Sequence, residues 1–238
     1  MRNLSRIREK RGSKKGIILL SGGIDSTVTL YLAKKYGYKL VALIFDYGQK
    51  HRKEIVHAQR IASLNRLEYY LIRLNLGWVK SSLVSKKREI PLDRDLSSPV
   101  IPSTYVAGRN IIFLSYAVSL AETKGASEIF IGAHTQDYSG YPDCRPQFLN
   151  KFEEAINLGI AHSSIKIIAP LIDKDKKEII KLGLKLGVPF HLTWSCYKGK
   201  DRPCLKCDSC RFRINAFKEL GLVDPLLTKR VRKRWKRK

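Results

Sequence analysis

The stretch Gly16-Ile-Ile-Leu-Leu-Ser-Gly-Gly-Ile-Asp-Ser-Thr27 decides the fold, because it joins a buried strand to a helix through a glycine turn. Residues 16–20 form a short apolar run, which Ser21-Gly22-Gly23 ends. A helical pattern then covers residues 26–36 and stops at Gly37. Two glycines allow close approach of the backbone to a ligand, and the following helix offers unpaired N–H groups and a positive dipole end. The stretch therefore predicts an anion-binding turn at the carboxyl end of a strand.

The residues of this turn allow two interpretations. The hydroxyl groups of Ser21, Ser26 and Thr27 add donors for an anion such as a phosphate. The chain contains no G-x-x-x-x-G-K-[ST] segment, so a Walker A loop is excluded. The alternative is a plain strand-to-helix turn in which Asp25 or Ser26 caps the helix.

The rest of the chain alternates strands and helices in the same way. Apolar strands followed by amphipathic helices predict an α/β fold, with a doubly wound, mostly parallel five-stranded sheet and a C-terminal zinc-bound segment. Further strands are expected at 40–45, 68–74, 128–132 and 166–169, and further helices at 51–64, 110–123, 148–158, 174–186 and 211–220. Residues 77–102 show no period and are expected to form a long loop or lid.

The amino-acid composition excludes several classes of protein. The 238 residues are 44% apolar and 28% charged, which is the balance of a globular domain. No apolar run approaches the roughly 18 residues that a membrane span needs, and no apolar stretch of the signal-peptide kind follows the basic start. Membrane, collagen-like, disulfide-scaffold and wholly disordered proteins are excluded, and a cytoplasmic location is expected.

The net charge of +25 is unusual and unevenly spread. Residues 1–15 carry +6 and residues 229–238 carry eight positive charges, which leaves +11 for the remainder. Such a field favours anionic partners, including nucleotides and nucleic acid. The alternative is that both ends are solvated tails.

Four of the five cysteines follow the spacing Cys196-x7-Cys204-x2-Cys207-x2-Cys210. Four thiolates on one short segment suit tetrahedral Zn²⁺ in a closed, structural site. An iron–sulfur cluster and free thiols are the alternatives. Clustered, unpaired cysteines also indicate a reducing compartment.

Two polar segments stand at 102–110 (PSTYVAGRN) and 137–145 (DYSGYPDCR). The tyrosines of the second segment suit stacking on a planar ring, and its Asp143 suits the amidine edge of a guanine-like base. Arg109 and Arg145 have the fork geometry that binds a carboxylate. The alternative is a turn whose tyrosines only cover the core.

The order SGGxDST, ST-x-x-x-GRN, DYSGYPDCR and the four cysteines resembles the 7-cyano-7-deazaguanine synthase family of PP-loop ATP pyrophosphatases, over about residues 16–222. The resemblance implies a reaction that adenylates the carboxylate of 7-carboxy-7-deazaguanine and admits ammonia to give the amide. A second adenylation, of the amide oxygen, then gives the nitrile in the biosynthesis of queuosine and archaeosine precursors. ATP with Mg²⁺ is the implied energy source, and one structural Zn²⁺ per chain is implied at Cys196, Cys204, Cys207 and Cys210.

The resemblance also assigns residues to roles. ATP binding is implied for Leu20, Ser21, Gly22, Gly23, Ile24, Asp25, Ser26, Thr27, Val28, Thr29, Leu30, Asp46 and Tyr47. Substrate binding is implied for Arg109, Asn110, Asp137, Tyr138, Tyr141, Asp143 and Arg145. Catalytic roles are implied for Asp25, Arg109 and Lys176, although Lys176 also fits a solvated helix face. Cys144 is expected to be a buried, unreactive thiol.

These expectations divide the chain into a basic tail (1–15), an ATP pyrophosphatase domain (16–190), a zinc segment (191–222) and a second basic tail (223–238). No room remains for a glutaminase domain, so free ammonia or a separate donor is expected. A homo-oligomer, with a dimer favoured, and loose tRNA contact through the tails are further expectations. The rival functions are a tRNA-modifying PP-loop enzyme (a thiolase or lysidine-type ligase) and a non-catalytic basic binding module.

Overall fold

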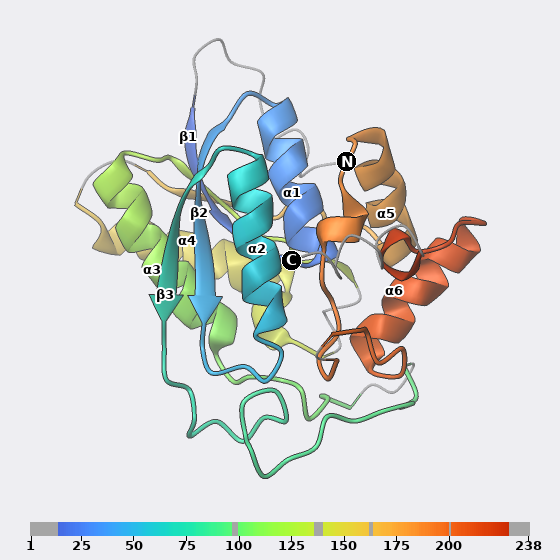
Figure 1. The fold of residues 1–238 in the computed structure, drawn as a ribbon. Helices are drawn as coiled ribbons and strands as arrows, with labels where there is room; N and C mark the ends of the chain where they lie inside the picture. The colour runs from blue at the N-terminus through green and yellow to red at the C-terminus, as the bar shows by residue number, and fades with distance from the viewer. Residues whose placement is uncertain (1–13, 97–99, 136–139, 162–163, 200, 229–238) are drawn as a thin grey trace.

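The computed structural model describes residues 14–96, 100–135, 140–161, 164–199 and 201–228 (Figure 1). Its centre is one sheet of five parallel strands in the order β3-β2-β1-β4-β5. The strands are β1 (Lys15–Leu19), β2 (Lys39–Asp46), β3 (Glu68–Arg73), β4 (Glu128–Phe130) and β5 (Lys166–Ile168). The predicted five-stranded α/β fold is confirmed, and the described sheet is parallel throughout.

Helices cover both faces of this sheet. One face packs on α3 and α4, and the other packs on α1 and α2, which lie in front of the strands in Figure 1. The last two long helices, α5 and α6, extend the second layer by packing beside α1. The helices are α1 (Ile24–Lys35), α2 (Lys53–Leu64), α3 (Arg109–Lys124), α4 (Pro146–Gly159), α5 (Lys176–Lys185) and α6 (Asp208–Glu219), with 3-10 turns η2 (Pro142–Cys144), η3 (Phe190–Leu192) and η4 (Pro225–Leu227).

The side-chain alternation of β1 explains why the sheet needs two layers of helices. Ile17 and Leu19 point to the core under α3 and α4, whereas Ile18 and Leu20 point to the core under α1 and α2. Successive side chains of a strand face opposite ways, so a strand apolar at every position is stable only when both faces are covered. The outer strand β3 is different, because all six of its side chains are exposed or half-buried.

The helix bounds differ from the sequence-based expectations where caps decide them. The helix expected at 174–186 begins at Lys176, because Asp175 caps it. The Asp175 carboxylate accepts from the N–H of Glu178 at 2.7 Å, and the Glu178 carboxylate accepts from the N–H of Asp175 at 2.9 Å. The helix expected at 211–220 begins three residues earlier, directly after its N-cap Cys207.

The segment between β3 and α3 has neither helix nor strand in its described residues, as expected for a long loop. It runs below the carboxyl ends of the strands in Figure 1 and approaches the start of α6. Its buried side chains Leu76, Leu83 and Ile90 join the main core. The N–H of Asp93 donates to the carbonyl of Lys206 at 2.9 Å, so this loop is tied to the cysteine segment.

No helix in the described part of the chain is long and apolar enough to cross a membrane. The basic ends fall almost entirely in residues 1–13 and 229–238, which lie outside the described residues. The expectations about those ends therefore stay predictions.

Candidate active site

The glycine turn after β1 is held from two sides. Gly22 has a φ of +78°, and a Cβ there would lie 2.5 Å from the Glu54 carbonyl oxygen and 2.6 Å from the Ala58 nitrogen. Only glycine fits this position, because α2 packs directly on the turn. From the other side, the N–H of Trp194 donates to the Gly22 carbonyl at 2.8 Å.

Helix α1 begins at Ile24 with Gly23 as its N-cap, and this glycine has no side chain that could accept from the first N–H groups. The alternative in which Asp25 or Ser26 caps this helix is therefore wrong. The first amides of a helix have no partner within the helix, so they stay available to a ligand. The Ser26 and Ser21 hydroxyls lie 3.0 Å apart, and the N–H of Ser21 donates to Ser26 Oγ at 3.2 Å. This arrangement is a preformed anion cradle.

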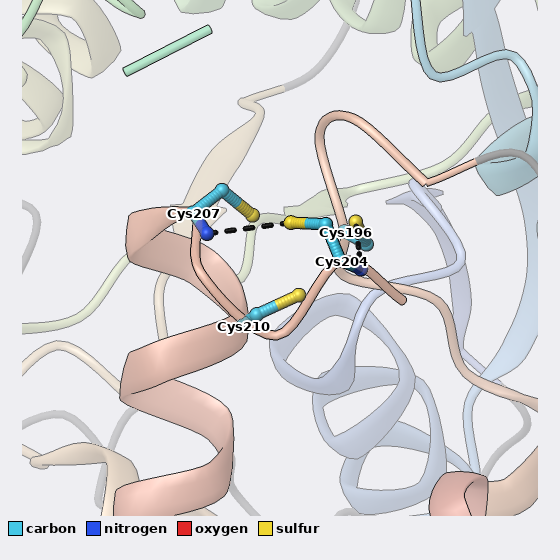
Figure 2. A group of neighbouring side chains, drawn as sticks. All are labelled: Cys196, Cys204, Cys207 and Cys210. Atoms are coloured by element: carbon cyan, nitrogen blue, oxygen red, sulfur yellow. Dashed lines mark hydrogen bonds between the residues drawn. The ribbon is translucent and has the colours of Figure 1, made fainter. Parts of the chain in front are cut away.

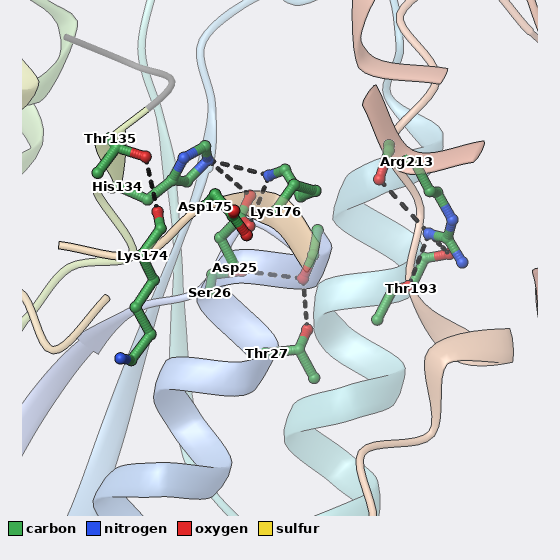
Figure 3. A network of polar contacts seen from close by, with 12 residues as sticks. Asp25, Ser26, Thr27, His134, Thr135, Lys174, Asp175, Lys176, Thr193 and Arg213 are labelled. Atoms are coloured by element: carbon green, nitrogen blue, oxygen red, sulfur yellow. Dashed lines mark hydrogen bonds and ion pairs between the residues drawn. The ribbon is translucent and has the colours of Figure 1, made fainter. Parts of the chain in front are cut away.

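Beside the cradle, three side chains from three elements meet (Figure 3). Lys176 at the start of α5 donates to Asp25 Oδ1 at 2.7 Å and lies 2.9 Å from His134 Nε2. His134 follows β4, and its Nε2 is 3.6 Å from Asp25 Oδ2. Burial raises the pKa of Asp25, but the charges of Lys176 and His134 outweigh burial and hold this pKa far below its usual value. Asp25 is therefore an anion at all working pH values.

Gly132, two residues after β4, sets how closely α1 approaches the sheet. A Cβ at this position would lie 2.9 Å from both the Asp25 carbonyl carbon and the Ser26 nitrogen. Those atoms belong to the first turn of α1, where the cradle lies. Glycine is therefore required here for close packing against backbone.

A cavity of about 280 Å³ opens at the carboxyl ends of the strands and contains the cradle. Of the residues assigned to ATP, those that line it are Leu20, Ser21, Gly23, Ile24, Asp25, Ser26 and Tyr47. The others lie behind this wall: Gly22, Thr27, Val28, Thr29, Leu30 and Asp46. Thr27 has a local role, since its hydroxyl donates to the Gly23 carbonyl at 2.6 Å. Asp46 ends β2 and accepts from Arg52 and from the N–H of Gly48.

The residues assigned to the deazapurine separate into three groups. Arg109, Asn110 and Tyr141 line the cavity, whereas Asp143 and Arg145 are not among its lining residues. Asp137 and Tyr138 lie outside the described residues.

Asp143 is buried, and its Oδ2 accepts from the N–H of Asn110 at 2.9 Å in the first turn of α3. Cys144 is buried as expected, with its sulfur 3.1 Å from Asn110 Nδ2. Asp143 and Cys144 therefore stabilise the start of α3 through these two contacts.

Arg109 is a fixed cation in the wall of the cavity. Its guanidinium carbon lies 6.0 Å from the ring centres of Tyr47 and Tyr141. Burial lowers the pKa of Arg109, but Tyr47, Tyr141, Cys144 and Asp143 together raise it above its ordinary value. A cation held between two rings is suited to bind an anionic group of a ligand.

Several lining residues carry no role in the sequence-based assignment, among them His134, His51, Glu54 and Asp208. His134 follows the fourth strand as Asp25 follows the first, but only the pairing of β4 with β1 brings these two residues together. The carboxyl ends of adjacent parallel strands meet at one edge, so such residues converge. His51 Nε2 lies 3.0 Å from Glu54 Oε2, which leaves Nδ1 as a buried acceptor with no hydrogen-bond partner among the described residues.

The four clustered cysteines come together where the chain enters α6 (Figure 2). Their sulfur atoms all lie within 4.8 Å of one another. Tetrahedral Zn²⁺ with Zn–S bonds of about 2.3 Å separates sulfurs by roughly 3.8 Å, so the set fits this ion. The thiols of Cys207 and Cys210, with the N–H groups of Cys204 and Gly199, hold the pKa of Cys196 well below its ordinary value.

Gly199 makes these sulfur contacts possible. Its N–H donates to Cys196 Sγ at 2.9 Å, and a Cβ there would lie 2.0 Å from the Arg202 carbonyl oxygen. The N–H groups of Cys204 and Cys207 donate to Cys196 Sγ and Cys204 Sγ at 3.2 and 3.3 Å. Donation from backbone N–H groups stabilises thiolates, which are the form that binds a metal.

A doubly wound parallel sheet with an anion cradle at the carboxyl end of its first strand defines the class of nucleotide-binding α/β enzymes. The family model for queuosine biosynthesis protein QueC matches residues 15–221. The chain is 49% identical over 220 residues to the 7-cyano-7-deazaguanine synthase of Clostridium kluyveri, covering 90% of this chain and 97% of that one. It is 47% identical to the Trichodesmium erythraeum synthase (90% and 100% covered) and 44% identical to the Thermoplasma volcanium synthase (90% and 90%). The chain belongs to the 7-cyano-7-deazaguanine synthase family and is an enzyme.

Among solved structures, the NMN synthetase of Francisella tularensis superposes with a TM-score of 0.49 at 16% identity. That match covers 94% of this chain and 82% of the other. The likeness is too distant to inform the site.

Proposed function

We propose that the cavity binds ATP together with 7-carboxy-7-deazaguanine and forms the nitrile of 7-cyano-7-deazaguanine there, using ammonia as the nitrogen source. One nitrile consumes two ATP and releases two AMP and two diphosphates. The observation that carries this proposal is the cradle at residues 21–26, already shaped and placed beside the Asp25–Lys176 pair inside the cavity. Membership of the family identifies the product, and the cradle provides the groups that bind the phosphates of ATP.

ATP lies with its phosphates against the first turn of α1. The first N–H groups of that helix and the hydroxyls of Ser21 and Ser26 donate to phosphate oxygens. Tyr47, after β2, lines the side of the cavity where the nucleoside would extend. Val28, Thr29 and Leu30 support the cradle from within α1, since all three are buried and none lines the cavity.

The chemistry begins when a carboxylate oxygen of the deazapurine attacks the α-phosphorus and diphosphate leaves. The new acyl adenylate has AMP as a good leaving group. Ammonia adds to its carbonyl carbon, AMP departs with the bonding electron pair, and one proton is lost to give the amide. The amide oxygen then attacks the α-phosphorus of a second ATP, and the second diphosphate leaves. Departure of AMP with the bonding electron pair and loss of both N–H protons form the C≡N bond.

Two cations of this chain stabilise the negative charge that moves in these steps. Lys176 reaches the phosphates beside the cradle, and Asp25 fixes its ammonium group at 2.7 Å. Arg109, held between two tyrosine rings, binds the carboxylate of the deazapurine or the adenylate formed from it. Preorganised charges of this kind, rather than a side-chain nucleophile, account for most of the rate increase.

Metal ions have two separate places in this proposal. Zn²⁺ would be held by the four clustered cysteines, where it supplies structure and no open coordination position. Mg²⁺ would accompany ATP, and Asp25 is the residue of the cradle whose carboxylate would hold it.

We also propose a cytoplasmic location. Clustered cysteines that form no disulfide are typical of a reducing compartment, which supports this location. We further propose a homodimer, and loose contact of the basic tails with tRNA.

The test is to incubate the protein with ATP, Mg²⁺, ammonium and 7-carboxy-7-deazaguanine without RNA, and to identify products by mass spectrometry. The nitrile, with AMP and diphosphate, is the expected result, and glutamine in place of ammonium gives no product. The high net charge favours a second candidate, a tRNA-modifying enzyme. AMP formation only after addition of tRNA would replace the proposed function with that one.

A further inference from the structure

Among the described residues, three acidic ones line the cavity, and they differ in how their oxygens are used. Both Asp25 oxygens face the Lys176 and His134 side chains. Both Glu54 oxygens are engaged, Oε1 by Gln49 at 2.9 Å and Oε2 by His51 at 3.0 Å. The third residue, Asp208, keeps one oxygen without a hydrogen-bond partner among the described residues.

Asp208 is the first residue of α6 and is 6% exposed. Its Oδ2 accepts from Arg94 Nε at 2.9 Å, whereas its Oδ1 is fully buried and has no donor within the described part of the chain. A buried carboxylate oxygen without a donor is unfavourable, so its retention calls for a donor from outside the chain, such as a ligand, a water or an ion. Asp208 therefore supplies a hydrogen-bond acceptor whose donor would come from a ligand.

The position of Asp208 is fixed by the loop between β3 and α3. Arg94 belongs to that loop, and its carbonyl also accepts from Arg211 on α6. The Arg94 side chain is three-quarters buried, so it holds the carboxylate in one orientation. The Asp208 carboxylate therefore belongs to a rigid part of the cavity wall and not to a mobile side chain.

The surroundings of Asp208 suit a flat ring. Phe212 lies one helical turn after Asp208 and lines the same cavity, as does Tyr197 from the cysteine segment. Leu96 and Pro102 of the facing loop add apolar area. An aromatic wall with one carboxylate acceptor matches a planar heterocycle that carries adjacent N–H donors.

We propose that Asp208 binds the amidine edge of the deazaguanine, its N1–H and exocyclic 2-amino group, and so determines specificity for guanine-like bases. This inference rests on the proposed function. The role was assigned to Asp143 from the sequence, but Asp143 accepts from the Asn110 backbone and does not line the cavity. Asp208 is the acidic side chain in the described cavity wall that has an acceptor to spare.

The test compares 7-carboxy-7-deazaguanine with its analogue that lacks the 2-amino group, by calorimetric binding and by turnover. Wild-type protein is expected to prefer the amino compound by roughly 100-fold, because the analogue leaves the buried carboxylate oxygen without its donor. In Asp208→Asn this preference falls below about 5-fold, while the KM for ATP stays within about 2-fold. A purely structural role for Asp208 would lower activity on both compounds equally and leave the preference intact.

Controls separate the possible failures. Zinc content and the thermal midpoint show whether Asp208→Asn is folded, and Asp208→Glu, which retains the carboxylate, is expected to keep the preference at reduced affinity. Wild-type protein that binds both compounds equally refutes the inference without any variant. Binding with the expected preference but no turnover refutes the proposed function and leaves the inference standing.

Discussion

Replacing Lys176 by Met should disable the enzyme while leaving its fold intact. Lys176 Nζ lies 2.7 Å from Asp25 Oδ1, and its side chain is 11% exposed. At an effective dielectric constant of about 20, the attraction over that distance is about 6 kcal/mol, most of which is offset by desolvation of the two charges. Because Asp25 is partly exposed, the net loss of unfolding free energy is about 2 kcal/mol, between the values for surface and buried pairs.

The catalytic effect is expected to be larger than this structural one. Removal of one preorganised charge at a developing anion lowers kcat by about 10²- to 10³-fold. Burial raises the pKa of Asp25, and Lys176 and His134 lower it. In Lys176→Met, only His134 still opposes the effect of burial on this pKa. The pKa of Asp25 rises in the variant, and the acid limb of the kcat/KM profile moves to higher pH.

The sign of the stability effect can be checked separately. Because the folded-state pKa of Asp25 is depressed, the ion pair contributes its full stability above the unfolded-state value of about 3.9. That contribution is lost as the pH falls through the folded-state value. Urea unfolding at pH 7 should therefore show the whole difference between wild type and variant.

The matched control is Lys177→Met, which removes the same charge from the neighbouring, exposed position of α5. Diphosphate release is measured for both variants at saturating and limiting ATP over a range from acid to mildly alkaline pH. If Lys176→Met stays within about 3-fold of Lys177→Met in kcat and shows no shift of its acid limb, the catalytic assignment of Lys176 is wrong.

Three further substitutions test other parts of the site. Gly132→Ala places a Cβ 2.9 Å from the backbone of the first turn of α1, so the KM for ATP should rise about 10-fold or more. The control is Gly159→Ala, whose Cβ meets nothing within 4 Å and should leave this KM unchanged. Cys204→Ser should contain no zinc by elemental analysis and should have a lower thermal midpoint, whereas Cys144→Ser should keep the zinc. Equal zinc in both variants would contradict the four-cysteine metal site. Arg213→Met removes the partner of the buried Asp224 carboxylate, now 2.6 Å away, and should cost about 3–5 kcal/mol in urea unfolding; a loss below about 1 kcal/mol would refute that estimate.

Local sequence signals predicted the sheet and the cradle because both depend on short-range pattern. Strands buried on both faces are apolar at every position, and the Gly22-Gly23 pair marks the turn, so each element could be recognised in isolation. The cysteine cluster was predictable for the same reason, since four ligands lie within one short segment. The element ends were less predictable, because caps such as Asp175 decide them through single hydrogen bonds.

Contacts between distant segments could not be predicted in this way. Asp143 and Asp208 are both acidic residues near polar and aromatic neighbours, and nothing local distinguishes them. Only the packing shows that α3 uses the oxygen of Asp143, while Asp208, which lines the cavity, keeps one oxygen without a partner among the described residues. His134 likewise joins Asp25 because β4 lies next to β1, which is a property of the strand order.

The cysteine segment supports the nucleotide cradle as well as itself. Arg213 on α6 donates to Thr193 Oγ1 at 2.8 Å and to the Phe190 carbonyl at 3.0 Å, which fixes the chain just before Trp194. The N–H of Trp194 in turn donates to Gly22, and its indole donates to the carbonyl of the cysteine ligand Cys196 at 2.9 Å. One path of hydrogen bonds therefore runs from the four sulfurs to the glycine turn. A metal held by these sulfurs would preorganise the proposed phosphate cradle without touching a reacting atom.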